Sequence, residues 1–243
     1  MNYKTIYKRA ARRGGWSKKE LDLTTRWGDF YEVAKKKLRG DEVALDIGTA
    51  EGNNFLRLAS CFKEGIGIDV EPVMIKLAQN NKNRYGIKNA VFKYMDAKKL
   101  KFPANNFDVI TIKHSPIYFK EACRVLKPGG LLITQQVHET DKLNLKRAFG
   151  RGQDYKERPG SLLRRYKGQA ERAGFKQIKS KISNIPYYFF SKKELIKFLN
   201  KVPTIPHFGS KKDYLILGKF IQKNKTPQGI KSNTSRFLLE MKK

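Results

Sequence analysis

Short apolar segments alternate with segments of helical periodicity between residues 41 and 137, and this alternation limits the possible folds more than any other feature. Strands are predicted at residues 43–47, 65–70, 90–94, 107–112 and 131–137. Helices are predicted between them, at 53–62, 72–84 and 117–126. Apolar strands that alternate with helices form a parallel sheet with helices on both faces. The sequence therefore predicts an α/β, doubly wound, mostly parallel sheet of Rossmann type.

The segments on either side of this core predict the domain organisation. Before it, a capping box at 17–20 and apolar residues at helical spacing indicate an amphipathic helix that ends at Gly40. After it, helices at 161–173 and 191–200 and strands at 175–182 and 213–220 complete a predicted seven-stranded sheet. We expect a basic N-terminal segment and helix over 1–40, one domain over 41–220, and a polar, basic C-terminal tail over 221–243.

The composition excludes several classes of protein. No apolar run approaches the ~20 residues that span a bilayer, and the basic N-terminus is not followed by the apolar stretch of a secretory signal. The two cysteines, Cys61 and Cys123, lack any C-x-x-C spacing, which argues against a disulfide framework or a cysteine zinc site. We therefore expect no membrane contact, no metal and a cytoplasmic location.

The net charge of +30 indicates a polyanionic partner. Residues 1–40 carry +8, residues 41–140 only +3 and residues 141–243 +19, so the excess lies in the flanks. Basic side chains cluster at 1–19 and at 142–167, and those at 142–167 are interleaved with aromatic residues, as in surfaces that neutralise phosphates and stack on unpaired bases. This pattern predicts RNA binding. A lysine-rich composition with solvated basic faces is the alternative reading.

One loop predicts where a ligand binds. The first strand ends at Asp46, and the small residues of Gly48-Thr49-Ala50-Glu51-Gly52 lead into a helix. Small residues let the backbone approach a ligand, and helix-terminal amides attract negative groups. The loop lacks the G-x-G-x-x-G of a dinucleotide-binding fingerprint and the Gly-Lys-Ser/Thr ending of a P-loop, which argues against both of these nucleotide sites. The second strand ends at Asp69, where a carboxylate can accept hydrogen bonds from ribose hydroxyls.

These motifs, with Asp96 after the third strand and the helix that ends in Arg124-Val125-Leu126-Lys127-Pro128-Gly129-Gly130, resemble the class I S-adenosylmethionine-dependent methyltransferases. The sequence is most similar to the small (type 11) methyltransferases like those of ubiquinone and menaquinone biosynthesis. Ala50 departs from the family loop D-x-G-x-G-x-G at its middle glycine. The resemblance implies S-adenosylmethionine as cofactor and, as binding residues, Asp46, Gly48, Thr49, Ala50, Gly52, Asp69, Val70, Met95, Asp96 and Ala97.

The segment after the fourth strand, residues 113–118, is expected to line the pocket near the transferred methyl. His114 is a candidate general base, because an imidazole pKa near 6.5 suits neutral pH, although it also fits an ordinary turn. Ser115-Pro116-Ile117-Tyr118 is similar to the (Asn/Asp/Ser)-Pro-Pro-(Tyr/Phe) motif of enzymes that methylate amino groups of bases, except at Ile117. Tyr118 is therefore a candidate for stacking on a base.

The expected function is that of an S-adenosylmethionine-dependent methyltransferase acting on RNA, either ribosomal or transfer RNA. The main alternative is a small-molecule methyltransferase whose apolar or aromatic acceptor lies under the N-terminal helix and the segment 187–190. A third possibility is a nucleic-acid-binding protein that keeps this fold without catalysis. Positioning alone accelerates methyl transfer, so the enzyme need not contain a fixed base.

Overall fold

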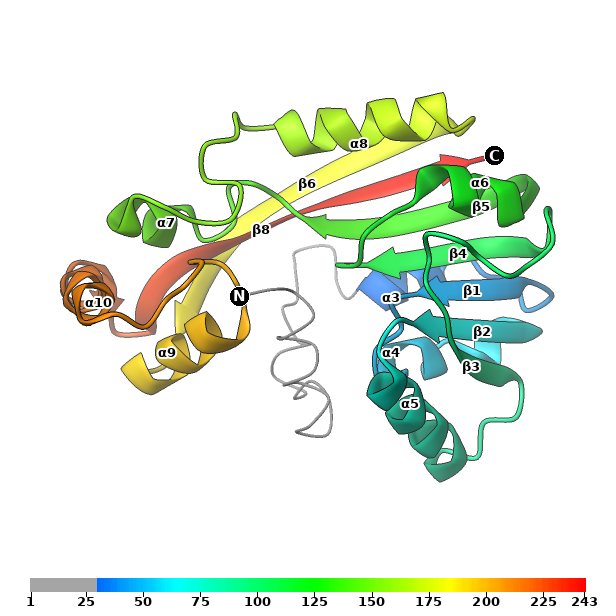
Figure 1. Cartoon of the computed structure of the whole chain (residues 1–243), viewed down its shortest axis with the longest axis horizontal. Helices are drawn as coiled ribbons and strands as arrows, with labels where there is room; N and C mark the ends of the chain where they lie inside the picture. Colours follow the sequence, from blue (N-terminus) through cyan, green and yellow to red (C-terminus); the bar gives the residue numbers. More distant parts are fainter. Residues whose placement is uncertain (1–29) are drawn as a thin grey trace.

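The computed structural model describes residues 30–243. The predicted capping box at 17–20 and the basic residues 1–19 lie outside the described residues. Five parallel strands form the core of the sheet in the order β3-β2-β1-β4-β5 (Figure 1). They are β1 (Val43–Ile47), β2 (Glu64–Asp69), β3 (Ala90–Tyr94), β4 (Phe107–Lys113) and β5 (Leu126–Val137). The predicted doubly wound α/β fold is confirmed.

Helices cover both faces of this sheet and bury two apolar clusters against it. On one face lie α3 (Phe30–Lys35), α4 (Asn53–Leu56), a 3-10 turn (Ala59–Cys61) and α5 (Pro72–Arg84). On the other face lie α6 (Phe119–Val125) and α8 (Ser161–Arg172). In α3, the described part of the predicted amphipathic helix, Phe30, Tyr31 and Ala34 are buried. A helix with one apolar face packs in this way because the burial of that face supplies most of its stability.

The C-terminal quarter of the chain differs from its prediction in two places. Residues 213–220, predicted as a strand, lie in α10 (Lys211–Asn224), which begins with a capping box of Ser210 and Asp213. Residues 221–243, predicted as a polar tail, contain β8 (Gly229–Lys242), which is inserted antiparallel between β5 and β6 (Lys176–Phe189). Polar residues in the first half of β8 masked its strand character. The predicted domain boundary at residue 220 is therefore wrong.

Strands β6 and β8 form a long antiparallel ribbon that extends past the core sheet and carries a second group of helices (Figure 1). These are α7 (Leu143–Phe149), α9 (Lys192–Lys201) and α10, which pack around a third apolar cluster that includes Phe189, Leu217 and Ile230. The short strand β7 (Lys225–Thr226) pairs with the start of β8, giving eight strands in the described residues. Ser191 is the N-cap of α9, because its hydroxyl accepts a hydrogen bond from the amide of Glu194.

Candidate active site

The loop between β1 and α4 is held against the end of β2 by backbone hydrogen bonds. The amides of Gly48 and Thr49 both donate to the carbonyl of Ile68, at 2.9 and 3.0 Å. Gly48 and Gly52 have φ of 75° and 74°, in the left-handed region that favours glycine. A Cβ at Gly48 would lie 2.5 Å from Ser115, and the loop therefore passes directly against the segment that follows β4.

Ala50 also adopts a left-handed conformation, with a φ of 50°. At this position the methyltransferase loop that the sequence resembles has glycine. The Ala50 amide donates to Asp69 Oδ2 at 2.9 Å, which explains how an alanine keeps this conformation. At Gly52 a Cβ would lie 2.6 Å from the ring of Phe92, so this position also has no room for a side chain. With Ala50 in place of the family's middle glycine, the loop still makes a tight turn at the C-terminal edge of the sheet.

Asp69 connects three segments at the edge of the sheet where β2 ends. Its carboxylate accepts hydrogen bonds from the amides of Ala50 and Glu71, the latter at 2.9 Å. Its backbone carbonyl accepts a hydrogen bond from the amide of Met95 at 3.0 Å. Burial raises the pKa of Asp69, although the backbone donors oppose this effect. Each carboxylate oxygen has a second lone pair, so the group can still accept hydrogen bonds from two vicinal hydroxyls.

Asp46 lies fully buried at the end of β1. Its Oδ1 accepts a hydrogen bond from Thr111 Oγ1 at 2.6 Å, and the hydroxyl of Tyr31 lies 3.4 Å from the same oxygen. Burial raises the pKa of Asp46 to about 6, against the opposing effect of these hydroxyl donors. Tyr31 comes from α3, and the N-terminal extension therefore contributes directly to this end of the site.

The remaining predicted cofactor residues line the edge of β2 and β3. Val70 is 45% exposed, and Asp96 is exposed with Oδ1 accepting the amide of Lys98 at 2.9 Å. Met95 and Ala97 are half-buried and pack against the core. The structure thus brings all ten predicted residues to the C-terminal edge of three adjacent strands, β1, β2 and β3.

His114 and Tyr118 lie in the segment after β4, but in different surroundings. His114 has a φ of 53°, and its amide donates to the carbonyl of Gln135 at 2.9 Å. Its Nε2 atom is buried without a hydrogen-bond partner in the described part of the chain. Burial, followed by the charges of Arg236 and Lys113, holds the pKa of His114 well below 6.5, so the imidazole is neutral at pH 7. Tyr118 lies at the start of α6, with Lys98 Nζ 6.0 Å from its ring centre.

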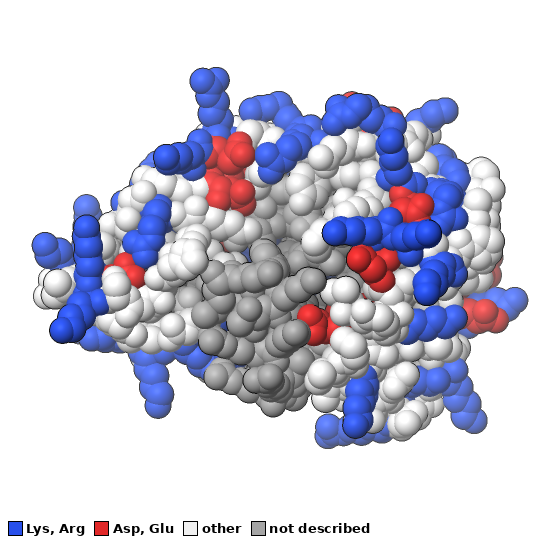
Figure 2. All heavy atoms as spheres, viewed as in Figure 1, with Lys and Arg blue, Asp and Glu red and all other residues white. Residues whose placement is uncertain are grey.

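Several residues of the predicted RNA-binding segment 142–167 are buried. Lys142 and Lys146 are only 1% and 2% exposed, and Phe149 is buried in the third apolar cluster. Tyr166 is half-buried and packs edge-on against Phe119 and Phe237. The side chains of Lys142, Lys146 and Phe149 therefore do not lie on the surface, where the prediction placed them. Exposed basic residues remain on α7 and α8, while Lys and Arg are scattered around the visible face and form no single stripe (Figure 2).

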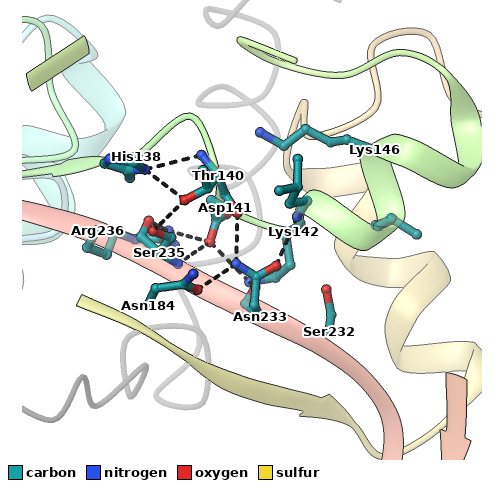
Figure 3. Close-up of polar contacts among 12 residues, drawn as sticks. His138, Thr140, Asp141, Lys142, Lys146, Asn184, Ser232, Asn233, Ser235 and Arg236 are labelled. Carbon is teal, nitrogen blue, oxygen red and sulfur yellow. Dashed lines mark hydrogen bonds and ion pairs between the residues drawn. The ribbon is translucent and has the colours of Figure 1, made fainter. Parts of the chain in front are cut away.

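A group of buried charged residues that was not predicted from the sequence lies where β5, α7 and β8 meet (Figure 3). Asp141 and Arg236 form an ion pair of 2.7 Å, and Lys142 Nζ lies 3.4 Å from the same carboxylate. The sequence signal was the run His138-Glu139-Thr140-Asp141-Lys142, in which acids lie next to the lysine that was assigned to the surface.

Residues 30–243 contain neither a candidate metal centre nor a helix that could span a membrane. These residues contain no group of three or more His, Cys, Asp and Glu side chains placed to hold a metal ion. None of the helices described here has the length and apolarity needed to cross a bilayer. Cys61 and Cys123 are both free thiols.

Comparison with known proteins identifies the class. The model of the methyltransferase domain family matches residues 38–161, about half of the chain. The uncharacterized methyltransferase YcgJ of Bacillus subtilis is 31% identical over 108 residues, covering 42% of this chain and 43% of YcgJ. The ubiquinone/menaquinone biosynthesis C-methyltransferase UbiE of Pseudomonas paraeruginosa is 30% identical over 130 residues, covering 49% and 51%. The matches therefore span about half the length of these curated relatives.

Solved structures extend the similarity of the fold to most of the chain. The crystal structure of YcgJ aligns with a TM-score of 0.62 and 20% identity, over 88% of this chain and 97% of that one. A SAM-dependent methyltransferase from Aquifex aeolicus aligns over the whole of both chains, with a TM-score of 0.57 and 16% identity. A structure titled as the [4+2]-cyclase SpnF also aligns, with a TM-score of 0.57, 18% identity and coverage of 88% and 80%. The fold alone therefore does not fix the reaction.

The fold and the family match define an S-adenosylmethionine-dependent methyltransferase domain. The chain belongs to the methyltransferase domain family, whose cofactor is S-adenosylmethionine. The site fits this cofactor on its own geometry. Glycines at positions 48 and 52 let the loop pack closely against Ser115 and Phe92, and Asp69 keeps lone pairs at the end of β2.

Proposed function

We propose that this chain transfers the methyl group of S-adenosylmethionine to a small-molecule acceptor. The observation that carries the proposal is the contact between the cofactor loop and the segment after β4, where Gly48 lies directly against Ser115. Because of this contact, a methyl donor held over Gly48 would lie beside His114 and Ser115. Holding donor and acceptor in line supplies much of the acceleration in such a reaction.

Each predicted binding residue has a role in this proposal. Asp69 accepts hydrogen bonds from the ribose hydroxyls, and Asp96 accepts one from the adenine amino group, with Met95 beside the ring. Asp46 and the loop hold the methionine end. The bound cofactor supplies an electrophilic methyl group on a sulfonium. Val70 and Ala97 border the adenine, and Thr49, Ala50 and Gly52 shape the loop.

His114 is the candidate proton acceptor for an acceptor group that carries a proton. Its buried Nε2 has no hydrogen-bond partner among the described residues, and its low pKa makes this nitrogen a weak base that is unprotonated at pH 7. The position of Tyr118 beside Lys98 gives no support to stacking on a base. We therefore assign Tyr118 no catalytic role.

A small acceptor is favoured over RNA by two observations. Two of the lysines expected to bind phosphates are buried in this structure. Among the relatives, UbiE is named for ubiquinone and menaquinone biosynthesis, and one solved structure of similar fold is titled a phosphoethanolamine N-methyltransferase. RNA remains the second candidate because the chain carries a net charge of +30 and Arg147, Arg158 and Arg164 are exposed.

The test is transfer of a labelled methyl group from S-adenosylmethionine into a cell extract separated into small molecules and RNA. We expect label in the small-molecule fraction, and expect it to disappear in the Asp69→Asn variant. Label in RNA alone would replace the small acceptor with RNA. An absence of transfer to either fraction, together with no binding of S-adenosylhomocysteine, would refute the proposed activity.

A further inference from the structure

Three charged side chains, called here the joint cluster, lie where the core sheet meets the β6–β8 ribbon (Figure 3). They are Asp141 and Lys142, between β5 and α7, and Arg236 on β8. Arg236 Nη1 lies 2.7 Å from Asp141 Oδ1, and Lys142 Nζ lies 3.4 Å from the same oxygen. Two cations therefore share one carboxylate, and the joint cluster has a positive net charge.

The joint cluster is buried, which makes its charge balance important. Lys142 is 1% and Arg236 7% exposed. Lys142 Nζ donates to the carbonyl of Asn233 at 2.9 Å and lies 4.6 Å from the ring centre of Tyr187. Burial lowers the pKa of Lys142 to about 8, although Asp141 opposes this. Buried cations are costly unless they are paired, so an additional anion here would be stabilising.

Arg236 can receive such an anion. The Nη1 atom of Arg236 pairs with Asp141 and donates to the carbonyl of Ser235 at 2.7 Å. Its Nε and Nη2 make no hydrogen bond within the described residues, and the side chain is 8% exposed. This edge of the guanidinium therefore has two N–H donors that no described residue uses. A planar guanidinium edge with two N–H donors matches the two oxygens of a carboxylate or a phosphate.

The joint cluster is also next to the proposed site of methyl transfer. Arg236 pairs in register with Val137, the last residue of β5, and ligands of doubly wound sheets bind outside the C-terminal ends of the strands. His114 approaches the same end of β5, because its amide donates to the carbonyl of Gln135, two residues before Val137. The charge of Arg236 contributes to lowering the pKa of His114. The side chain of Gln136 joins β5 to the segment after β4, because its Nε2 donates to the carbonyl of Ser115 at 3.0 Å.

We propose that Arg236 binds the anionic group, a carboxylate or a phosphate, of the small methyl acceptor. Asp141 and Lys142 act as positioning residues that orient the guanidinium and offset each other's charge. The inference rests on the proposed function and narrows its acceptor to a small acid. The burial of the joint cluster favours a small ligand over the backbone of a nucleic acid, which would need a wider approach.

The test compares Arg236→Gln and Arg236→Lys with a matched control, Lys231→Gln. Lys231 is an exposed residue of the same strand, so its substitution removes one positive charge without touching the joint cluster. The full-length protein is saturated with S-adenosylhomocysteine, and thermal shifts are measured with acetate, inorganic phosphate or poly-uridine, against chloride of equal ionic strength. Acetate and phosphate separate the two kinds of acid, and poly-uridine reports on RNA.

We expect acetate or phosphate to stabilise the wild type and Lys231→Gln equally, and the Arg236 variants to need at least ~10-fold more anion. This corresponds to the loss of one charge-assisted pair. Arg236→Lys retains a cation for Asp141, so its loss of affinity cannot be attributed to unfolding. Equal anion responses in all four proteins, or an Arg236-dependent response to poly-uridine alone, would overturn the inference. A wild type that does not bind S-adenosylhomocysteine refutes the proposed function instead.

Discussion

The carboxylate of Asp69 accepts a hydrogen bond from the amide of Ala50 at 2.9 Å, and this bond joins the end of β2 to the loop after β1. It fixes the position of an acid relative to a backbone cradle whose glycines have no room for a side chain. The same carboxylate can accept from hydroxyls of a ligand. This one contact therefore links the local shape of the loop to the proposed binding of the cofactor.

Asp69→Asn should weaken binding of S-adenosylhomocysteine by ~10–100-fold, because hydrogen bonds to a charged acceptor contribute roughly 1.5–3 kcal/mol. Isothermal titration calorimetry measures the change. The matched control is Asp108→Asn at the opposite end of the sheet, where the carboxylate accepts the amide of Val43. This control should lose stability but retain affinity. Equal affinities of the wild type and Asp69→Asn would remove Asp69 from the site.

Gly48→Ala and Gly129→Ala separate the cost of a left-handed backbone from the cost of a clash. Both glycines have a φ of 75°, but a Cβ at Gly129 would meet no atom within 4 Å, whereas at Gly48 it would lie 2.5 Å from Ser115. Each substitution should cost about 1–2 kcal/mol for the backbone, and Gly48→Ala about 1–3 kcal/mol more for overpacking. Denaturant unfolding measures both. Equal losses would mean that Ser115 moves freely away from the loop.

The buried Asp46 should make the stability of the cofactor-free protein depend on pH. Its folded pKa of about 6 lies above the ordinary value of 3.8, so the folded state binds more protons between these values. Stability therefore falls as pH rises from about 4 to about 6 and remains lower above that, by roughly 3 kcal/mol. Asp46→Asn should abolish this slope in urea unfolding and weaken cofactor binding. A slope that persists in the variant would assign it to another group.

His114→Gln should lower kcat by ~10²–10⁴-fold if the acceptor loses a proton to this imidazole. Affinity for S-adenosylhomocysteine should be unchanged. Since the pKa of His114 lies well below 6.5, the base stays unprotonated near neutrality, and wild-type kcat should show no loss between pH 7 and 6 from this group. An acid limb centred near 6.5 that disappears in His114→Gln would show an imidazole in ordinary surroundings. An unchanged kcat in the variant would exclude the proton transfer.

The core of the fold was predictable because its strands are buried on both faces and therefore read as apolar runs, such as 107–112. The cofactor loop was predictable because its small residues are adjacent in sequence. The course of β8 was not, because its buried polar residues, such as Ser235, are satisfied by partners distant in the sequence, among them Asp141. Lys142 was placed on the surface for the same reason, since only the tertiary fold brings Asn233 to it.

A crystal structure of the protein with S-adenosylhomocysteine tests the central claim most directly. We expect the ribose hydroxyls on Asp69, the adenine beside Met95 and Asp96, and the sulfur directed toward His114 and Ser115. Density for the ligand elsewhere in the molecule, or a ribose that does not contact Asp69, would contradict it.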